Sequence, residues 1–245
     1  MASDSLVGEL AARAQVDQTG EAFDRIQQEL VAAAGRVRAR LEAHLEKLRR
    51  TDPAKAEDFW ERLTPEWKDK YCDRAGEHIA KWREFMPHLD GFAQAYEIGV
   101  GPGSLFRLLT ELKGVRMWGC DADPEHSIVF RELRKEVGIA DRVDNFPVQR
   151  RAPVPIPEGT EALMGFYTTF SRKFSVQDWE WLLDFCRERL VGEKWIVMLP
   201  NPKSFGREGV AEFFRRKADF PLLDRKVPEE SQLWHNRAFC RFSLA

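Results

Sequence analysis

The spacing of hydrophobic residues changes near residue 90, and this change constrains the fold more than any other feature of the chain. Between residues 21 and 50, apolar side chains recur every three or four positions, which is typical of one face of a helix. The residues of this face are Phe23, Ile26, Leu30, Ala34, Val37, Leu41, Leu45 and Leu48. Beyond residue 91, short apolar stretches alternate with helical ones. We therefore expect a helical N-terminal extension over residues 1–90 and an α/β domain over residues 91–245.

The C-terminal part alternates between predicted strands and predicted helices. The strand candidates lie at residues 93–98, 115–120, 143–148, 162–169, 195–199, 222–227 and 238–244. The helix candidates lie at residues 105–112, 125–137, 178–190 and 209–218. Because strands joined through a helix usually run parallel, this order predicts a doubly wound, mostly parallel seven-stranded sheet. Ligands of such sheets bind beyond the carboxyl ends of the strands.

The N-terminal extension is expected to continue as shorter helices after a break at Asp52-Pro53, with a further helix over residues 67–85. Its aromatic residues either cover an active site or hold these helices on the sheet. They are Trp60, Trp67, Tyr71, Trp82 and Phe85. The apolar face of residues 21–50 has a heptad-like spacing, so it either pairs with a second copy in a homodimer or packs on its own domain.

Charge and composition exclude several classes of protein. The 245 residues carry 38 Lys and Arg against 40 Asp and Glu, a net charge of −2, so we expect no nucleic-acid partner. The four cysteines and five histidines are scattered without metal-ligand spacing, so we expect reduced thiols and no metal. No apolar run approaches the roughly 18 residues that a membrane span needs. The N-terminus lacks a signal-peptide pattern, and the expected location is cytoplasmic.

A glycine-rich segment from Tyr96 to Ser104 lies between a predicted strand and a predicted helix. A phosphate-binding P-loop needs a lysine after its last glycine, and Ser104 stands there instead. The dinucleotide fingerprint Gly-x-Gly-x-x-Gly is matched only in part, because its third glycine falls on Ser104 or Phe106. The pattern Glu-x-Gly-x-Gly-x-Gly is matched in full, at Glu97, Gly99, Gly101 and Gly103.

With these residues the chain resembles the class I S-adenosylmethionine-dependent methyltransferases, whose first motif has this form. The resemblance covers about residues 92–245 and implies a Rossmann-like sheet. It implies that Glu97 closes the first strand and helps to place the methionine end of S-adenosylmethionine. It also implies that the three glycines bring the backbone against this cofactor.

A second acidic residue, Asp121, ends the next predicted strand. In the methyltransferase family, and also in NAD-binding proteins, such a carboxylate accepts the ribose hydroxyls. Asp121 and the adjoining Ala122 are therefore expected to bind a ribose-bearing cofactor. They do not distinguish S-adenosylmethionine from a nicotinamide dinucleotide. The alternative for Asp121 is an ordinary turn or cap residue.

The ends of the third and fourth predicted strands supply further candidates. The resemblance implies a polar residue beside the adenine, which is Gln149 if the alignment runs through Pro147. It places Tyr167 and Thr168 beside the transferred methyl group. The candidates for a general base are His78, His88, His126, His235 and Asp144, and for each the alternative is a structural role.

The resemblance implies methyl transfer from S-adenosylmethionine to a small-molecule or saccharide acceptor, with oxygen as the expected target. Four basic residues are expected in loops on the ligand side, where they either attract an anionic substrate or form a solvated surface. They are Arg150, Arg151, Arg172 and Lys173. Two other interpretations stay open: a nicotinamide-dependent oxidoreductase, and a non-catalytic adaptor whose functional surface is the helical arm.

Overall fold

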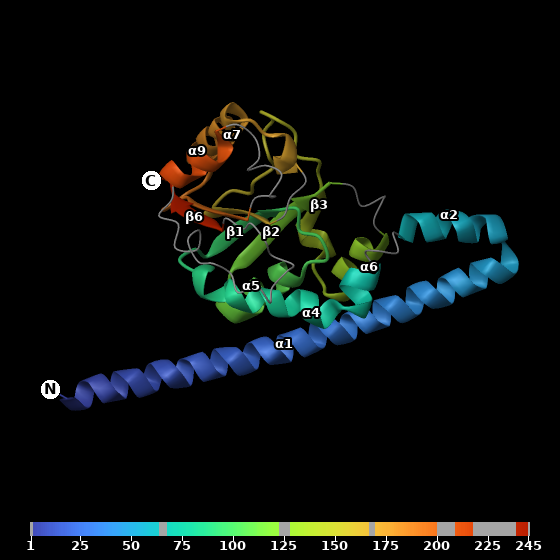
Figure 1. Cartoon of the computed structure of the whole chain (residues 1–245), viewed down its shortest axis with the longest axis horizontal. Coiled ribbons are helices and arrows are strands. Elements are labelled where there is room, and N and C mark those ends of the chain that lie inside the picture. Colours follow the sequence, from blue (N-terminus) through green and yellow to red (C-terminus); the bar gives the residue numbers. More distant parts are fainter. Residues whose placement is uncertain are drawn as a thin grey trace. The chain divides into compact units, whose positions relative to one another are not determined.

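The computed structural model describes residues 2–63, 68–122, 128–166, 170–199, 209–217 and 239–244 (Figure 1). The helices are α1 (Ala2–Thr51), α2 (Pro53–Leu63), α4 (Ala75–Ala80), α5 (Ser104–Lys113), α6 (Ile128–Glu136), α7 (Val176–Arg189) and α9 (Val210–Lys217). The strands are β1 (Gln94–Ile98), β2 (Arg116–Asp121), β3 (Val143–Asn145), β4 (Ala162–Phe166), β5 (Trp195–Leu199) and β6 (Cys240–Ser243). Short helical turns are η1 (Asp69–Asp73), η2 (Lys81–Glu84), η3 (Met86–His88), η4 (Ala140–Arg142) and η5 (Phe170–Lys173).

The chain divides into two compact units. The first consists of Met1–Pro87, Pro102–Gly114 and Glu125–Ile139, and it is helical where it is described. The second consists of His88–Gly101, Val115–Pro124 and Ala140–Ala245, and it contains the sheet.

The sheet of the second unit has the order β3-β2-β1-β4-β5-β6. Its first five strands run parallel, and β6 pairs antiparallel with β5. The prediction of a mostly parallel, doubly wound sheet is therefore confirmed, with six strands in the described part of the chain. The predicted strand at residues 222–227 lies outside the described residues. The strand order reverses between β1 and β4, and in this architecture ligands bind at that point.

The register brings several strand ends to one edge of the sheet. Ile98 at the end of β1 pairs with Cys120, and Asp121 pairs with Asn145. The third strand is shorter than the predicted 143–148, and it ends at Asn145. Phe146 still donates its backbone N–H to the carbonyl of Asp121 at 3.0 Å.

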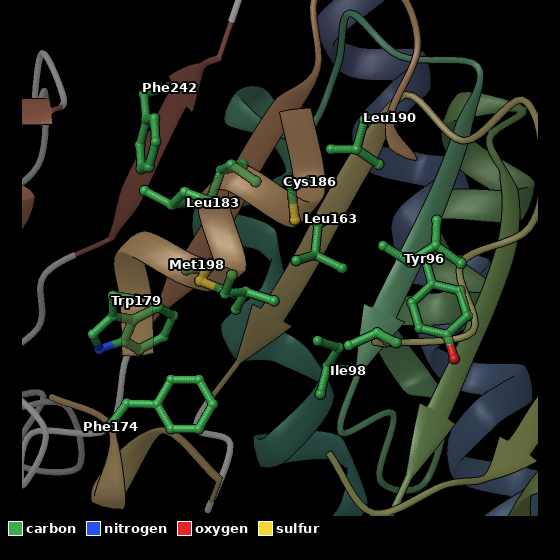
Figure 2. Packing of buried hydrophobic residues seen from close by; sticks show 14 of the residues in the cluster. Tyr96, Ile98, Leu163, Phe174, Trp179, Leu183, Cys186, Leu190, Met198 and Phe242 are labelled. Carbon is green, nitrogen blue, oxygen red and sulfur yellow. The ribbon is translucent and has the colours of Figure 1, made fainter. Parts of the chain in front are cut away.

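An apolar core fills one side of this sheet (Figure 2). Every residue of β1 and β4 is buried, as expected for central strands of a parallel sheet. From α7, the side chains of Trp179, Leu183 and Cys186 pack into the cluster with Met198 and Phe242 of the last two strands. Fully burying one large apolar side chain stabilises a fold by about 1.5–3 kcal/mol, so these contacts hold α7 firmly on the sheet.

The first unit is built around α1. The predicted apolar face from Phe23 to Leu45 is buried, and α1 contacts α2, α4, α5 and α6. These side chains therefore pack within their own chain, which was one of the two alternatives for this face. The break after Thr51 is confirmed, and Lys55 donates its backbone N–H to Asp52 Oδ1 at 3.2 Å. Among the described residues, no helix has both the length and the apolarity that crossing a membrane requires.

The expectation of one helix over residues 67–85 is wrong for its described part. A π-helical turn, η1, comes first, and Arg74 donates its backbone N–H to the carbonyl of Asp69 at 2.8 Å. Arg74 then leaves the helical region, with φ −109° and ψ 29°, before α4 begins. The wider turn interrupts the i to i−4 hydrogen bonds, yet Trp82 and Phe85 remain buried. These two residues pack the unit together, whereas Trp60 is 40% exposed.

Candidate cofactor site

The loop after β1 turns sharply because its glycines adopt left-handed backbone angles. Gly99, Gly101 and Gly103 have φ of 78°, 57° and 88°. Residues with a side chain rarely adopt such angles, so glycine is needed at each position. Gly99 and Val100 both donate their N–H groups to the carbonyl of Cys120, at 2.7 and 3.3 Å. The loop is therefore tied to β2 at the edge where ligands of such sheets bind.

Asp121 contacts this loop directly. Its Oδ2 accepts a hydrogen bond from the backbone N–H of Gly101 at 3.0 Å. The carboxylate is partly buried at the end of β2, and Ala122 follows it at the surface. Glu97 lies in β1 and is only 2% exposed. The structure thus brings Asp121, the predicted acidic residue at the end of β2, into contact with the predicted glycine loop.

Sequence reasoning missed Gly119, which lets β1 and β2 come close together beneath the loop. A Cβ atom at this position would lie 2.5 Å from the carbonyl oxygen of Glu97 and 2.5 Å from Cγ2 of Val100. Neither distance is sterically acceptable, so only glycine fits here. The available signal was a glycine inside a predicted strand, which often marks a close backbone approach.

Gly103 belongs to the first unit, where it caps the N-terminus of α5. A Cβ atom there would lie 2.2 Å from Cδ1 of Ile139, a residue at the end of the segment that contains α6. Gly103 is therefore required both by its backbone angle and by its packing. The contact with Ile139 had no signal in the sequence, because the two residues are far apart along the chain.

The remaining predicted cofactor residues and base candidates lie outside the glycine loop. Gln149 is exposed in the loop that follows β3. Tyr167 and Thr168 lie outside the described residues, as do the base candidates His126 and His235. Asp144 is exposed in β3, in register with Cys120.

Burial keeps several titratable groups neutral. It raises the pKa of the Tyr96 hydroxyl, and it raises the pKa of the Cys120 thiol to about 11. In the first unit, burial and then the charges of Lys70 and Lys81 lower the pKa of His78 to about 3. Among the described residues, no group of three or more His, Cys, Asp and Glu side chains is arranged to hold a metal ion.

The site is chemically suited to a ribose-bearing cofactor. A carboxylate accepts hydrogen bonds from hydroxyls, and Asp121 presents one at the end of β2. The glycine backbone of the neighbouring loop allows a ligand to approach closely. These two features fit both S-adenosylmethionine and a nicotinamide dinucleotide.

Comparison with known proteins gives structural similarity alone. No model of a known protein family and no curated protein matches the chain. Among solved structures, it is similar to the mitomycin 7-O-methyltransferase MmcR, with 22% identity, a TM-score of 0.38, and coverage of 64% of this chain and 42% of that one. It is also similar to the CcbJ methyltransferase from Streptomyces caelestis, with 16% identity, a TM-score of 0.39, and coverage of 49% and 48%.

A third similar structure is the glycopeptide N-methyltransferase MtfA in complex with S-adenosylmethionine, with 16% identity and a TM-score of 0.39. This alignment covers 49% of this chain and 53% of MtfA. The chain thus spans about half the length of these proteins. The strand order of its own sheet, with the glycine loop after β1 and the acidic end of β2, gives this chain the Rossmann-like architecture expected of a class I methyltransferase.

Proposed function

We propose that this protein is an S-adenosylmethionine-dependent methyltransferase that acts on a small-molecule or saccharide acceptor, with oxygen as the methylated atom. The observation that carries the proposal is the hydrogen bond from Gly101 to Asp121. It joins the glycine loop after β1 and the acidic end of β2 at the ligand-binding edge of the sheet. The choice of a small-molecule acceptor and of oxygen rests on the family resemblance.

The cofactor residues in this proposal are those of the motif positions. Asp121 and Ala122 bind the ribose, Glu97 places the methionine end, and Gln149 lies beside the adenine. The backbone of Gly99, Gly101 and Gly103 faces the cofactor, and Tyr167 and Thr168 line the methyl group. S-adenosylmethionine, when bound, supplies a methyl group activated by its positively charged sulfur. The protein's own task is then to align the acceptor with that methyl group.

The described residues near the site favour a mechanism that positions the acceptor over one that relies on a strong acid or base. Cys120 and Tyr96 are too buried to ionise near neutral pH. Asp144 is the exposed carboxylate on the strand next to Asp121, and it is the described candidate for a base at this edge. A weakly acidic hydroxyl needs such a base, whereas a phenol needs little more than correct placement.

A nicotinamide-dependent oxidoreductase remains the second candidate, because Asp121 suits the ribose of either cofactor. Isothermal titration of the purified chain with S-adenosylhomocysteine, and separately with NADH, distinguishes the two. Micromolar binding of S-adenosylhomocysteine without NADH binding is the expected result. Binding of NADH alone would replace the proposal with the oxidoreductase. If neither ligand binds, the cofactor assignment fails and the adaptor interpretation gains support.

We further propose that residues 1–90 act as the helical extension and residues 91–245 as the cofactor-binding domain, in the cytoplasm. A homodimer through the N-terminal helices is part of the same proposal. Since the apolar face from Phe23 to Leu45 is buried within the chain, the dimer contact has to use another part of α1. Sedimentation equilibrium of the full chain tests this: a dimer mass supports it, and a monomer mass at high concentration contradicts it.

A further inference from the structure

The sheet-containing unit has two short basic segments that are not assigned to the cofactor. Arg150 and Arg151 lie in the loop that follows β3, and Lys173 ends η5, which follows β4. Both segments come after the carboxyl ends of parallel strands, which is the side of the sheet where ligands bind. Arg150 and Lys173 are exposed, and within the described part of the chain neither forms an ion pair.

The buried carboxylate of Asp178 links the two segments through hydrogen bonds. Asp178 is 4% exposed, and its Oδ1 accepts a hydrogen bond from Nε of Arg151 at 2.9 Å. Its Oδ2 accepts from the backbone N–H and from the hydroxyl of Ser175, at 2.9 and 2.8 Å. Arg150 directly precedes Arg151, and Lys173 lies two residues before Ser175. The two exposed cations therefore each lie within two residues of a residue that hydrogen-bonds to Asp178.

Buried apolar residues anchor both segments in the same core. Phe174, between Lys173 and Ser175, is 2% exposed and packs edge-on against Trp179, with 5.3 Å between ring centroids (Figure 2). On the other side, Val154 is 1% exposed and belongs to the same apolar cluster. These buried residues anchor the backbone of both segments in the core.

The backbone of Arg151 is itself strained. Its φ is 51°, in the left-handed region that residues with a side chain rarely occupy. Such angles cost on the order of 1 kcal/mol or more and persist only where surrounding contacts hold them, as the Asp178 ion pair does here. Strained residues of this kind cluster at ligand sites.

We propose that Arg150 and Lys173 bind an anionic group of the methyl acceptor, a carboxylate or a phosphate, at the carboxyl edge of the sheet. The pair Arg151–Asp178 organises this site and does not contact the ligand. That the bound anion belongs to a methyl acceptor rests on the function proposed above. Guanidinium and ammonium groups both donate charge-assisted hydrogen bonds to such oxygens, and two cationic donors together select for an anion over a neutral group.

The test titrates the full chain with two anions, inorganic pyrophosphate and citrate, which represent the phosphate and carboxylate sources. Binding is followed by amide chemical shifts in the wild type and in Arg150→Gln/Lys173→Gln. Both substitutions are at exposed positions, and the single variants serve if the double variant unfolds. Lys113→Gln/Arg189→Gln is the matched control, because it removes the same charge from exposed positions elsewhere.

The expected result is saturable binding of at least one anion to the wild type and to the control. The dissociation constant should rise about tenfold or more in Arg150→Gln/Lys173→Gln, as expected for losing charge-assisted hydrogen bonds. The anion that binds more tightly shows whether the site prefers a phosphate or a carboxylate group. Equal affinity in all three proteins, or no saturable binding to the wild type, would overturn the proposal.

A separate titration with S-adenosylhomocysteine distinguishes this proposal from the function on which it rests. Its affinity should be the same in the wild type and in Arg150→Gln/Lys173→Gln, because neither residue is assigned to the cofactor. If S-adenosylhomocysteine fails to bind any of the proteins, the proposed function fails while the anion titration still decides the anion site.

Discussion

The carboxylate of Asp121 accepts a hydrogen bond from the backbone N–H of Gly101 at 3.0 Å, although 20 positions separate the two residues. This contact fixes the acidic end of β2 against the glycine loop that follows β1. It holds the two parts of the candidate cofactor site in a defined arrangement. Such preorganisation lowers the entropic cost of binding.

Substituting Gly119 with alanine is expected to destabilise the protein, because its Cβ would meet the Glu97 carbonyl and Val100 Cγ2 at 2.5 Å each. Forcing an extra carbon into a well-packed site costs about 1–3 kcal/mol. Urea denaturation measures this loss of unfolding free energy. The control is Gly35→Ala in α1, where nothing lies within 4 Å of the added carbon. It should stabilise the helix by up to about 1 kcal/mol. Equal stability of both variants would contradict the close approach of β1 and β2.

Gly103→Ala is expected to be destabilising for two separable reasons. The added carbon would lie 2.2 Å from Cδ1 of Ile139, and φ is 88°. Replacing Ile139 with valine removes Cδ1, so the double variant Gly103→Ala/Ile139→Val should recover only the steric part. The backbone part, about 1 kcal/mol, should remain. Thermal unfolding of the single and double variants checks this. Full recovery in the double variant would mean that the positive φ imposes no cost.

The Ser175–Asp178–Arg151 junction should make stability depend on pH in acid. Burial alone would raise the pKa of Asp178, but hydrogen bonds from Ser175 and Arg151 outweigh it and hold the pKa below the ordinary value of 3.8. The unfolded chain therefore takes up this proton first as the pH falls. The stabilisation is fully present above about pH 5, and it is lost as the pH falls from 3.8 through the lower pKa of the folded state.

Asp178→Asn tests this dependence. The variant should be less stable than the wild type near neutral pH, by about 1 kcal/mol for the weakened helix cap. The difference should shrink as the pH approaches about 3, where the wild-type carboxyl is also protonated in the unfolded chain. Urea denaturation across this range measures it, with Asp141→Asn as an exposed control. A difference that stays constant with pH would argue against the depressed pKa.

His78 should affect stability over a higher pH range. Its ring packs edge-on against Tyr71 at 4.6 Å, and its pKa is lowered to about 3 from 6.5 by burial and by Lys70 and Lys81. The unfolded chain binds this proton below about pH 6.5, so stability should be lost progressively as the pH falls from there toward 3. His78→Phe keeps an aromatic ring without the titration and should lose less stability between about pH 7 and 4.5. Identical losses in the two proteins would contradict the burial of this imidazole.

The strands near the site could be predicted from sequence because each is a short apolar run beside a glycine or an acidic residue. The predicted strands at 93–98, 115–120 and 195–199 correspond to β1, β2 and β5. The candidate cofactor residues could be chosen from the sequence because their motifs are defined by residue type and spacing along the chain. These residues are Glu97, Gly99, Gly101 and Asp121.

Other features depend on contacts that distant residues make, and the sequence does not display them. A side chain at position 119 would clash with the Glu97 carbonyl and Val100, and one at position 103 would clash with Ile139. The 67–85 region kept its apolar spacing while its backbone formed a π-helical turn, because burial fixes where side chains go and leaves the turn type open. The link between the two basic segments depends on Asp178, whose sequence context predicted only a helix start.

The central claim, that Asp121 holds the ribose of S-adenosylmethionine, is tested most directly by titrating S-adenosylhomocysteine into the wild type, Asp121→Ala and the exposed control Asp141→Ala. Loss of a hydrogen-bonded carboxylate should weaken binding by about tenfold or more, since hydrogen bonds to charged groups contribute about 1.5–3 kcal/mol. This loss is expected in Asp121→Ala alone, and the affinity of Asp141→Ala should equal that of the wild type. Unchanged affinity in a folded Asp121→Ala variant would contradict it.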